Sequence, residues 1–264
     1  KLKTNAELVL ERQTELPEYV VPKWTKILTA GVDVQETSLY WSIRAWGKYL
    51  TSQNIAHGQA LSFEEIDRIM NISYQTEDGD PVVVNLCLVD SGDQTDLVYD
   101  FCALHSDYAL PVKGSSHSQL SHYKISTINR PDSRAHGMQL VLVDGGKYKD
   151  MIAGRMQRPN GRGSWMVYEG CDMEYATQVT AEHKVNVKVP GGVRQVWQPK
   201  RAHADNHYLD AEVYNAAAAD IMGVRTLHLS EDEEQTVQTE EPETPEEQWI
   251  KANENWIQEG NNGR

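Results

Sequence analysis

Three aspartates stand at positions where the sequence could bring their carboxylates together. Asp33 ends the apolar run of residues 27–32, and Asp90 ends a second apolar run, residues 82–89. If these runs are neighbouring parallel strands, their carboxyl ends lie about 4.8 Å apart, at the edge where open α/β sheets bind ligands. Asp210 lies near the start of a predicted helix, on the stripe that its apolar residues occupy, so we expect its side chain to face the sheet.

Carboxylates this close repel one another unless a proton or a cation lies between them. The hard divalent ions Mg²⁺ and Mn²⁺ are the usual occupants of an all-oxygen site. In two-metal sites, ions roughly 3.5–4 Å apart activate a water and stabilise the leaving oxygen of a phosphodiester. The pattern therefore favours a two-ion site with Asp33, Asp90 and Asp210 as metal ligands and catalytic residues.

A structural interpretation competes with this one. An aspartate after a strand is often a turn residue or the N-cap of the next helix. Residues 90–93 could form such a turn, with Asp93 or Thr95 capping the helix, and residues 35–37 after Asp33 also have the composition of a turn. The residue pattern alone leaves both interpretations open.

The remaining patterning predicts the elements that must position these acids. Alternation in residues 39–46 predicts a strand antiparallel to residues 27–33, whereas the run 82–90 does not alternate, which is typical of a central parallel strand. We further expect a strand around 49–56, strands at 109–112 and 139–143, helices at 5–12, 63–74, 97–104, 147–156 and 206–222, a loop region at 115–137 and a hairpin of 184–189 with 193–197. This order predicts an α/β fold: a mixed sheet of an antiparallel meander plus parallel strands, flanked by helices, with a β-hairpin insertion.

The composition excludes several classes of protein. The 264 residues are 39% hydrophobic and 24% charged, enough to build a sizeable core. No apolar run approaches the roughly 18 residues of a membrane span, and the three scattered cysteines fit a reducing compartment and no disulfide framework. The net charge is −14, but residues 230–264 hold 11 acidic and two basic residues, so residues 1–229 carry only −5 and can still contain a basic groove.

Basic residues gather on and after the predicted hairpin, where they could hold a DNA backbone without reading its sequence. The predicted contacts are Lys184, Lys188, Arg194, Lys200 and Arg201, with Arg155, Arg158 and Arg162 as a second group. The competing interpretation is that these are ordinary solvated side chains, and the sequence does not decide between the two.

Other catalytic and metal motifs fit poorly. His203 and His207 have the spacing of two zinc ligands on a helix, but Ala204 occupies the position of a metalloprotease glutamate. We find no Gly-x-Ser-x-Gly elbow and no GxxxxGK[ST] phosphate loop, so the sequence predicts no ATP site in this chain. A phosphate-binding strand of the actin-like kinase type would need glycine where Gln35 stands.

Several blocks resemble the nuclease region of tailed-phage terminase large subunits, in the branch typified by phage lambda. The first block is residues 28–35, and together the blocks span about residues 7–223 in the family's order. The others are Val89-Asp90-Ser91-Gly92 with Thr95, Val98, Tyr99 and Phe101, Val112-Lys113-Gly114, Thr180-Ala181-Glu182, and residues 206–210 with Val213, Tyr214 and Ala216 to Ala219.

The resemblance implies an RNase H-like fold and a metal-dependent endonuclease that cuts concatemeric viral DNA during genome packaging. Carried over by position, the metal-bound acids are Asp33, Asp90 and Asp210, with Lys113 as a phosphate contact and His207 beside Asp210 as accessory residues. Asp93 departs from the family's pattern as an additional acid at the rim of the site. The implied partners are double-stranded DNA, the terminase small subunit and the portal protein, in the host cytoplasm on the viral procapsid.

The resemblance also sets the expected domains. Because family members carry an ATPase motor and this chain begins at Lys1, we expect residues 1–24 to be a strap from a motor in cis, and residues 25–229 to be the nuclease domain. Residues 230–264 are expected to be an acidic, disordered tail whose amphipathic segment, residues 246–258, docks on the portal. The alternative function is a catalytically weak module that grips DNA and docks on the portal.

Overall fold

The computed structural model of the chain describes residues 3–229, of which those up to Arg225 belong to one compact unit. The predictions for the tail, residues 230–264, therefore lie outside the described residues. The helices are α1 Ala6–Glu11, α2 Phe63–Met70, α3 Thr95–Leu104, α4 Gly145–Met156, α5 Met173–Val179 and α6 His207–Ile221, with short 3₁₀ turns η1 Lys48–Leu50 and η2 Val224–Thr226. No helix in this part of the chain has the length and apolar character that a membrane crossing needs.

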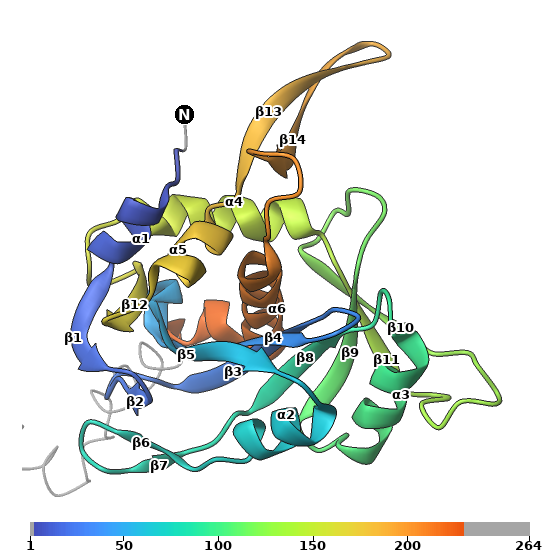
Figure 1. Cartoon of the computed structure of the whole chain (residues 1–264), viewed down its shortest axis with the longest axis horizontal. Coiled ribbons are helices and arrows are strands. Elements are labelled where there is room, and N and C mark those ends of the chain that lie inside the picture. The colour runs from blue at the N-terminus through green and yellow to red at the C-terminus, as the bar shows by residue number, and fades with distance from the viewer. Residues whose placement is uncertain (1–2, 230–264) are drawn as a thin grey trace, which may run out of the picture. The chain divides into compact units, whose positions relative to one another are not determined.

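The largest sheet of the described residues has nine strands in the order β1-β12-β5-β4-β3-β8-β9-β11-β10 (Figure 1). Its strands are β1 Gln13–Pro17, β3 Ile27–Val34, β4 Leu39–Trp46, β5 Ser52–Ala60, β8 Leu86–Asp90, β9 Ala109–Gly114, β10 Tyr123–Thr127, β11 Gln139–Val143 and β12 Trp165–Glu169. β4 and β10 run opposite to the other seven strands. The carboxyl ends of β3, β8 and β9 therefore meet at one edge.

Helices cover both faces of this sheet: α1, α4, α5 and α6 on one, α2 and α3 on the other (Figure 1). β3 is buried along its whole length, and its residues alternate between the two faces. Leu28, Ala30 and Val32 join the core with Ile66 of α2, whereas the residues between them face α6. Pleating thus places Asp33 on the α6 face, within an otherwise apolar strand.

Two smaller sheets complete the unit. β13 Glu182–Val189 and β14 Gly192–Pro199 form an antiparallel hairpin that projects from the body above α4 (Figure 1). β2 Val20–Val21, β6 Tyr74–Thr76 and β7 Pro81–Val82 form a three-stranded sheet. The hairpin turns at Gly191 and Gly192, whose φ angles of 90° and 157° suit glycine.

The mixed sheet flanked by helices confirms the predicted fold class and is consistent with an RNase H-like nuclease fold. Most predicted elements are present, with corrected ends. The predicted helix 63–74 ends at Met70, where Asn71 bonds the Asp67 carbonyl at 2.7 Å, and Tyr74 begins β6. The third meander strand starts at Ser52, after η1, and the loop region 115–137 contains β10.

Two further corrections concern elements near the site. The sequence predicts no element between 157 and 183, where the structure has β12 and α5. Helix α4 begins at Gly145, before the predicted Lys147, because the Asp144 side chain accepts the Lys147 amide at 3.3 Å. Within residues 1–24, β1 pairs with β12 at the edge of the large sheet, and the strap from a motor stays a prediction.

Candidate active site

Asp33 and Asp90 lie side by side at the carboxyl ends of β3 and β8. The two strands run parallel, with Val32 opposite Val89, and the next residue of each is an aspartate. Asp33 is only 2% exposed, whereas Asp90 is partly exposed. The arrangement is the one that the sequence predicts for these two residues.

Helix α6 brings Asp210 to the same place. α6 crosses β3 so closely that a Cβ on Gly31 would lie 2.0 Å from the carbonyl oxygen of Ala211. Only glycine at this point of β3 permits that approach. Asp210 precedes Ala211 and acts electrostatically with both Asp33 and Asp90, so the three aspartates share one patch.

Burial and neighbouring charges raise the pKa values of two of these acids. The pKa of Asp90 is raised to about 6, mainly by burial; the charges of Asp33 and Asp93 act in the same direction, and the Gly92 amide, which donates to Asp90 at 3.0 Å, acts against them. Burial raises the pKa of Asp210 to about 7, with the charge of Lys149 opposing and that of Asp33 adding to the shift. Acids with raised pKa values at neighbouring strand ends are a mark of functional sites.

Asp33 has hydrogen-bond donors of its own. His207 Nδ1 lies 2.8 Å from Asp33 Oδ2, and Gln35 Nε2 donates to the same oxygen at 2.9 Å. Hydrogen bonding to Asp33 raises the pKa of His207, whose ring also stacks on Tyr40 at 4.3 Å. His207, expected beside Asp210, is thus bonded to Asp33.

Glu182 and Lys149 border the site, although the sequence predicts no role in it for either residue. Lys149 Nζ lies 3.0 and 3.1 Å from the two Glu182 oxygens, and Asn206 donates to Glu182 at 2.8 Å. Both charges act on Asp210. Glu182 lies in one of the matched sequence blocks, but Lys149 gave no sequence signal because its partner is 33 residues away.

A buried ion pair anchors α6 next to the aspartates. Arg44 of β4 and Glu212 of α6 are in direct contact, and neither side chain is exposed. Glu212 also accepts from Ser42 and, at 3.0 Å, from Asn54. The Arg44 guanidinium donates to Met166 O at 3.0 Å and packs over the Trp165 ring at 3.8 Å.

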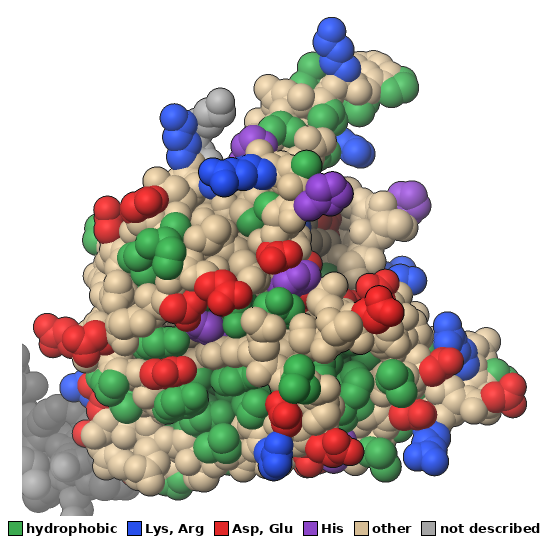
Figure 2. Space-filling view, in the orientation of Figure 1, with side chains coloured by type: hydrophobic (Ala, Val, Ile, Leu, Met, Phe, Trp, Pro, Cys, Tyr) green, Lys and Arg blue, Asp and Glu red, His purple; other side chains and the backbone are tan. Residues whose placement is uncertain are grey.

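A cavity of about 690 Å³ opens between α4, α6, residues 114–118 and the hairpin, and Asp210 lies in its wall. Its basic side chains are Lys147, Lys149, Lys184 and Arg194. Lys184 bonds Asp150 at 2.8 Å, and Lys147 lies 4.0 Å from Asp144. Figure 2 shows Lys and Arg side chains on the hairpin and acidic side chains on the body below it.

Comparison with protein families identifies the family to which this chain belongs. The family described as terminase large subunit gpA, endonuclease domain, matches residues 1–231. This chain belongs to the terminase gpA endonuclease-domain family. No curated protein and no solved structure matches it.

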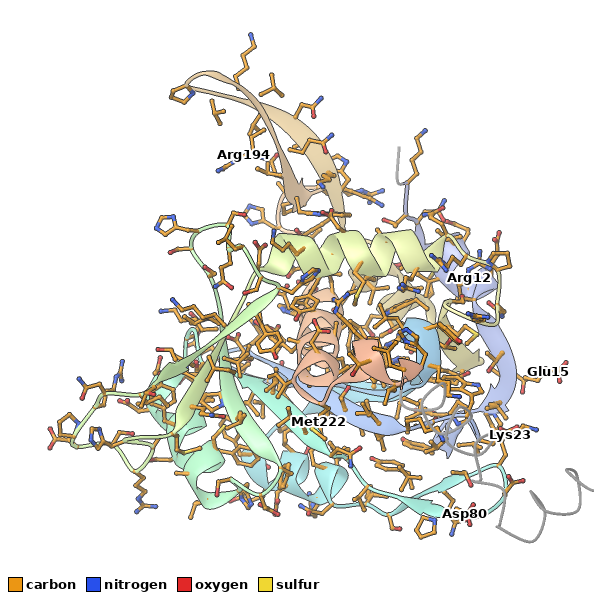
Figure 3. All side chains as sticks on the ribbon, turned by 180° about the vertical axis from the view of Figure 1, so that it is seen from behind. Arg12, Glu15, Lys23, Asp80, Arg194 and Met222 are labelled. Atoms are coloured by element: carbon orange, nitrogen blue, oxygen red, sulfur yellow. The ribbon has the colours of Figure 1, made fainter. Side chains whose placement is uncertain are left out.

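The predicted DNA contacts of this terminase domain do not share one face of the hairpin. Lys184 and Lys188 share one face, but Arg194 pairs with Val187 and therefore lies on the other, extending from β14 in Figure 3. Lys200 donates to the Thr4 carbonyl at 2.5 Å, and Arg201 is exposed after the hairpin.

The second arginine group of the terminase domain has structural contacts at the far end of α4 from the cavity. Arg155 donates to the carbonyls of Tyr49 and Gly163, both at 3.0 Å, and Arg162 packs over the Tyr49 ring at 3.5 Å. These contacts hold the turn at Tyr49 against α4.

Two accessory predictions fall at the rim of the site. Lys113 follows Val112, the partner of Asp90, so pleating directs the exposed Lys113 side chain to the opposite face of the sheet. Asp93 is exposed and acts on Asp90 through its charge. Neither Asp93 nor Thr95 caps α3 through its side chain, since the N-cap is Gln94.

A separate group of potential metal ligands lies on the same face of the terminase domain. In the described part of the chain, one set of three His, Cys, Asp or Glu side chains has ligand atoms all within 4.8 Å of one another: His57, Cys171 and Asp172.

Proposed function

We propose that this domain is a metal-dependent endonuclease that cuts concatemeric viral DNA during genome packaging, with Asp33, Asp90 and Asp210 as catalytic metal ligands. The observation that carries the proposal is the convergence of these carboxylates, from two strand ends and one helix, on one patch. Membership of the terminase endonuclease-domain family supports the same reaction.

The donor atoms suit Mg²⁺ or Mn²⁺. All three acids offer only oxygen, the ligand that these hard cations prefer. Within the described residues Asp210 has no hydrogen-bonded or ion-paired partner for its carboxylate, and repulsion from Asp33 and Asp90 adds to its raised pKa. We propose a pair of ions, as in the two-metal sites that cleave phosphodiesters. When bound, such a pair of ions supplies an activated water and a positive charge for the leaving oxygen.

The surrounding residues position the acids and the substrate. His207 and Gln35 fix the rotamer of Asp33, while Asn206 and Lys149 hold Glu182 at the edge of the site. The adjoining cavity leads from Asp210 to the hairpin, where Arg194 lines it and can contact a phosphate; the exposed Lys188, on the other face of the hairpin, offers a second contact outside the cavity. Such contacts hold the DNA backbone and do not read its sequence.

Plasmid nicking in Mn²⁺ tests the proposal. Asp33→Asn, Asp90→Asn and Asp210→Asn keep the side-chain shape and remove the charge, and each should slow nicking by more than about 100-fold. The exposed Asp100→Asn, in α3, is the matched control and should nick at nearly the wild-type rate. Circular dichroism establishes that each variant is folded.

The alternative, a DNA-gripping module without cutting activity, predicts a different result. It would bind DNA with the wild-type affinity in all four variants and show no nicking above background in either Mg²⁺ or Mn²⁺. That result, or equal nicking by the three aspartate variants and the wild type, contradicts the proposal.

The proposed setting follows from the family. We infer that the domain acts in cis with a terminase ATPase motor, because the matched family is a domain of the terminase large subunit. Its further partners would be double-stranded DNA, the terminase small subunit and, through residues 230–264, the portal protein of the procapsid in the host cytoplasm. Deleting residues 231–264 should abolish portal association and leave DNA cutting intact.

A further inference from the structure

The group His57, Cys171 and Asp172 joins two strands that are far apart in sequence. His57 lies on β5 and is 8% exposed, and Cys171, which is 6% exposed, follows the neighbouring strand β12. Asp172 is the N-cap of α5, and its side chain is 49% exposed. The group is therefore mostly buried, with one ligand open to solvent.

The hydrogen bonds of Asn54 determine which ring nitrogen of His57 carries its proton. Asn54 Nδ2 faces three acceptors: Ser42 Oγ at 2.8 Å, Ala56 O at 3.3 Å and Glu212 Oε1 at 3.0 Å. Its Oδ1 is therefore the atom 3.1 Å from His57 Nδ1. Since that oxygen only accepts, Nδ1 must donate, and the neutral ring then has its lone pair on Nε2.

His57 Nε2 directly contacts Asp172 Oδ2. A neutral Nε2 and a carboxylate oxygen are both acceptors, so a proton or a cation must lie between them. A His that donates through one ring nitrogen to a carbonyl and presents the other to a cation has the arrangement of metal-bound histidines.

Cys171 makes the group a site for a particular class of cation. Its Sγ lies within 4.8 Å of the ligand atoms of His57 and Asp172. One sulfur, one nitrogen and one carboxylate oxygen form a donor set that suits Zn²⁺ and is foreign to Mg²⁺. A tetrahedral ion with bonds of about 2.0–2.3 Å separates its ligands by about 3.3–3.7 Å, so the His57–Asp172 contact must open slightly.

The residues around this group offer a fourth metal ligand and fix the orientation of the His57 ring. The Tyr168 hydroxyl lies 3.4 Å from His57 Nε2, so this hydroxyl or a water can complete four-coordination. The His57 ring stacks on Tyr175 at 4.1 Å and meets the edge of Tyr208 at 5.1 Å. These rings fix the imidazole plane and link the group to α5 and α6.

We propose that His57, Cys171 and Asp172 form a Zn²⁺ site, distinct from the all-oxygen aspartate patch. Binding replaces the proton on His57 Nε2 and the Cys171 thiol proton by the metal ion, and both protons pass to solvent. The bound ion ties β5 to the start of α5 and, through Tyr208, supports the first turn of α6. The proposal does not depend on nuclease activity.

Cobalt titration of the full chain, stripped of metal by a chelator, tests this site. Co²⁺ replaces Zn²⁺ and gives an ultraviolet charge-transfer band only when a thiolate binds it. We expect this band to saturate at one equivalent and to disappear on addition of Zn²⁺. Cys171→Ser should lose the band, whereas Cys102→Ala, which removes another buried thiol, should retain it.

Two further variants test whether the metal binds at this group or at the aspartate patch. Asp172→Asn keeps a helix-capping side chain and should weaken Zn²⁺ binding by about 100-fold or more. Asp33→Asn should leave the cobalt band unchanged. An intact wild-type protein with no thiolate band at stoichiometric Co²⁺ overturns the proposal, and so does a band that survives in Cys171→Ser. If Cys171→Ser does not fold, Asp172→Asn and the wild-type titration decide.

Discussion

Two carboxylates that lie two residues apart on α6 have opposite surroundings. Glu212 is 1% exposed and meets Arg44, Ser42 and Asn54, which together satisfy both of its oxygens. Asp210, in the first turn of α6, faces Asp33 and Asp90, and burial raises its pKa to about 7. One acid is fully paired, and the other is held among like charges.

Under the proposed function, this difference separates the acid that anchors α6 from the acid that binds metal. An acid that must receive a metal ion cannot be satisfied by the protein, so its charge destabilises the metal-free state. The neighbouring paired acid supplies the attachment that keeps the helix in place despite this repulsion. Four substitutions can test this division of roles.

The largest expected effect is on the anchor. Glu212→Ala leaves the Arg44 guanidinium buried without its carboxylate, which should lower the free energy of unfolding by about 3–5 kcal/mol. Urea unfolding followed by circular dichroism measures the change. The exposed Glu36→Ala should change it by less than about 0.5 kcal/mol. A loss below about 1 kcal/mol for Glu212→Ala would show that the ion pair does not anchor α6.

The next largest effect is expected at Gly31, where α6 approaches β3 beside the aspartates. Gly31→Ala adds a Cβ where the Ala211 carbonyl lies 2.0 Å away, so α6 must shift. We expect a loss of about 1–3 kcal/mol in unfolding free energy, together with weaker Mn²⁺ binding measured by calorimetry.

Gly154→Ala provides the control for this substitution. A Cβ at Gly154, inside α4, meets no atom within 4 Å, and the change should stabilise the helix by up to about 1 kcal/mol. Unchanged Mn²⁺ affinity in Gly31→Ala would mean that the aspartates do not need this close approach.

A smaller effect of opposite sign is expected at Asp210. The folded-state pKa, about 7, is above the usual 3.8, so ionisation of Asp210 penalises the folded state as pH rises between these values. In chelator, Asp210→Asn should match the wild type near pH 4 and be more stable by about 1–2 kcal/mol above pH 7. Thermal unfolding across this pH range measures the difference. Asp93→Asn should show no such trend, and a destabilised Asp210→Asn at pH 8 contradicts the argument.

The smallest effect is expected at the hairpin. Three of the four basic side chains around the cavity, all lysines, have acidic partners, so the fourth, Arg194, is the one we expect to meet DNA. This one side chain should contribute at most one phosphate contact. In chelator, Arg194→Ala should lower DNA affinity by a few-fold and reduce the slope of log K against log salt by about 1. Fluorescence anisotropy at several salt concentrations measures both. Lys124→Ala, on the outer strand β10, should leave the slope unchanged.

The sequence predicted the centre of the site because its signals are local. A strand that ends in an acid is visible in a short window, and two such strands at a sheet edge place Asp33 and Asp90 together without further information. Asp210 followed from the 3.6-residue period of its helix. The interpretation of residues 90–93 as a turn also has support, since the Gly92 amide donates to the Asp90 carboxylate at 3.0 Å.

The parts that the sequence did not predict depend on long-range pairing. β12 is a five-residue run with four buried residues, too short for periodicity to separate strand from helix. Its parallel pairing with β5 brings Cys171 near His57, 114 positions away, which no sequence spacing could indicate. Lys149 and Arg44 likewise find their acidic partners through tertiary packing.

The buried guanidinium of Arg44 links several elements of the fold and so limits how they can move. Arg44 of β4 contacts α6 through Glu212, β5 through Ser52, β12 through Trp165 and Met166, and α5 through Tyr175. Opening of α6 alone would leave the buried Arg44 guanidinium without its carboxylate, so we expect local opening of this helix to cost about as much as opening the whole unit. Backbone amides of α6 should therefore exchange with deuterium only through global unfolding, and the helix that carries Asp210 should stay fixed against the sheet.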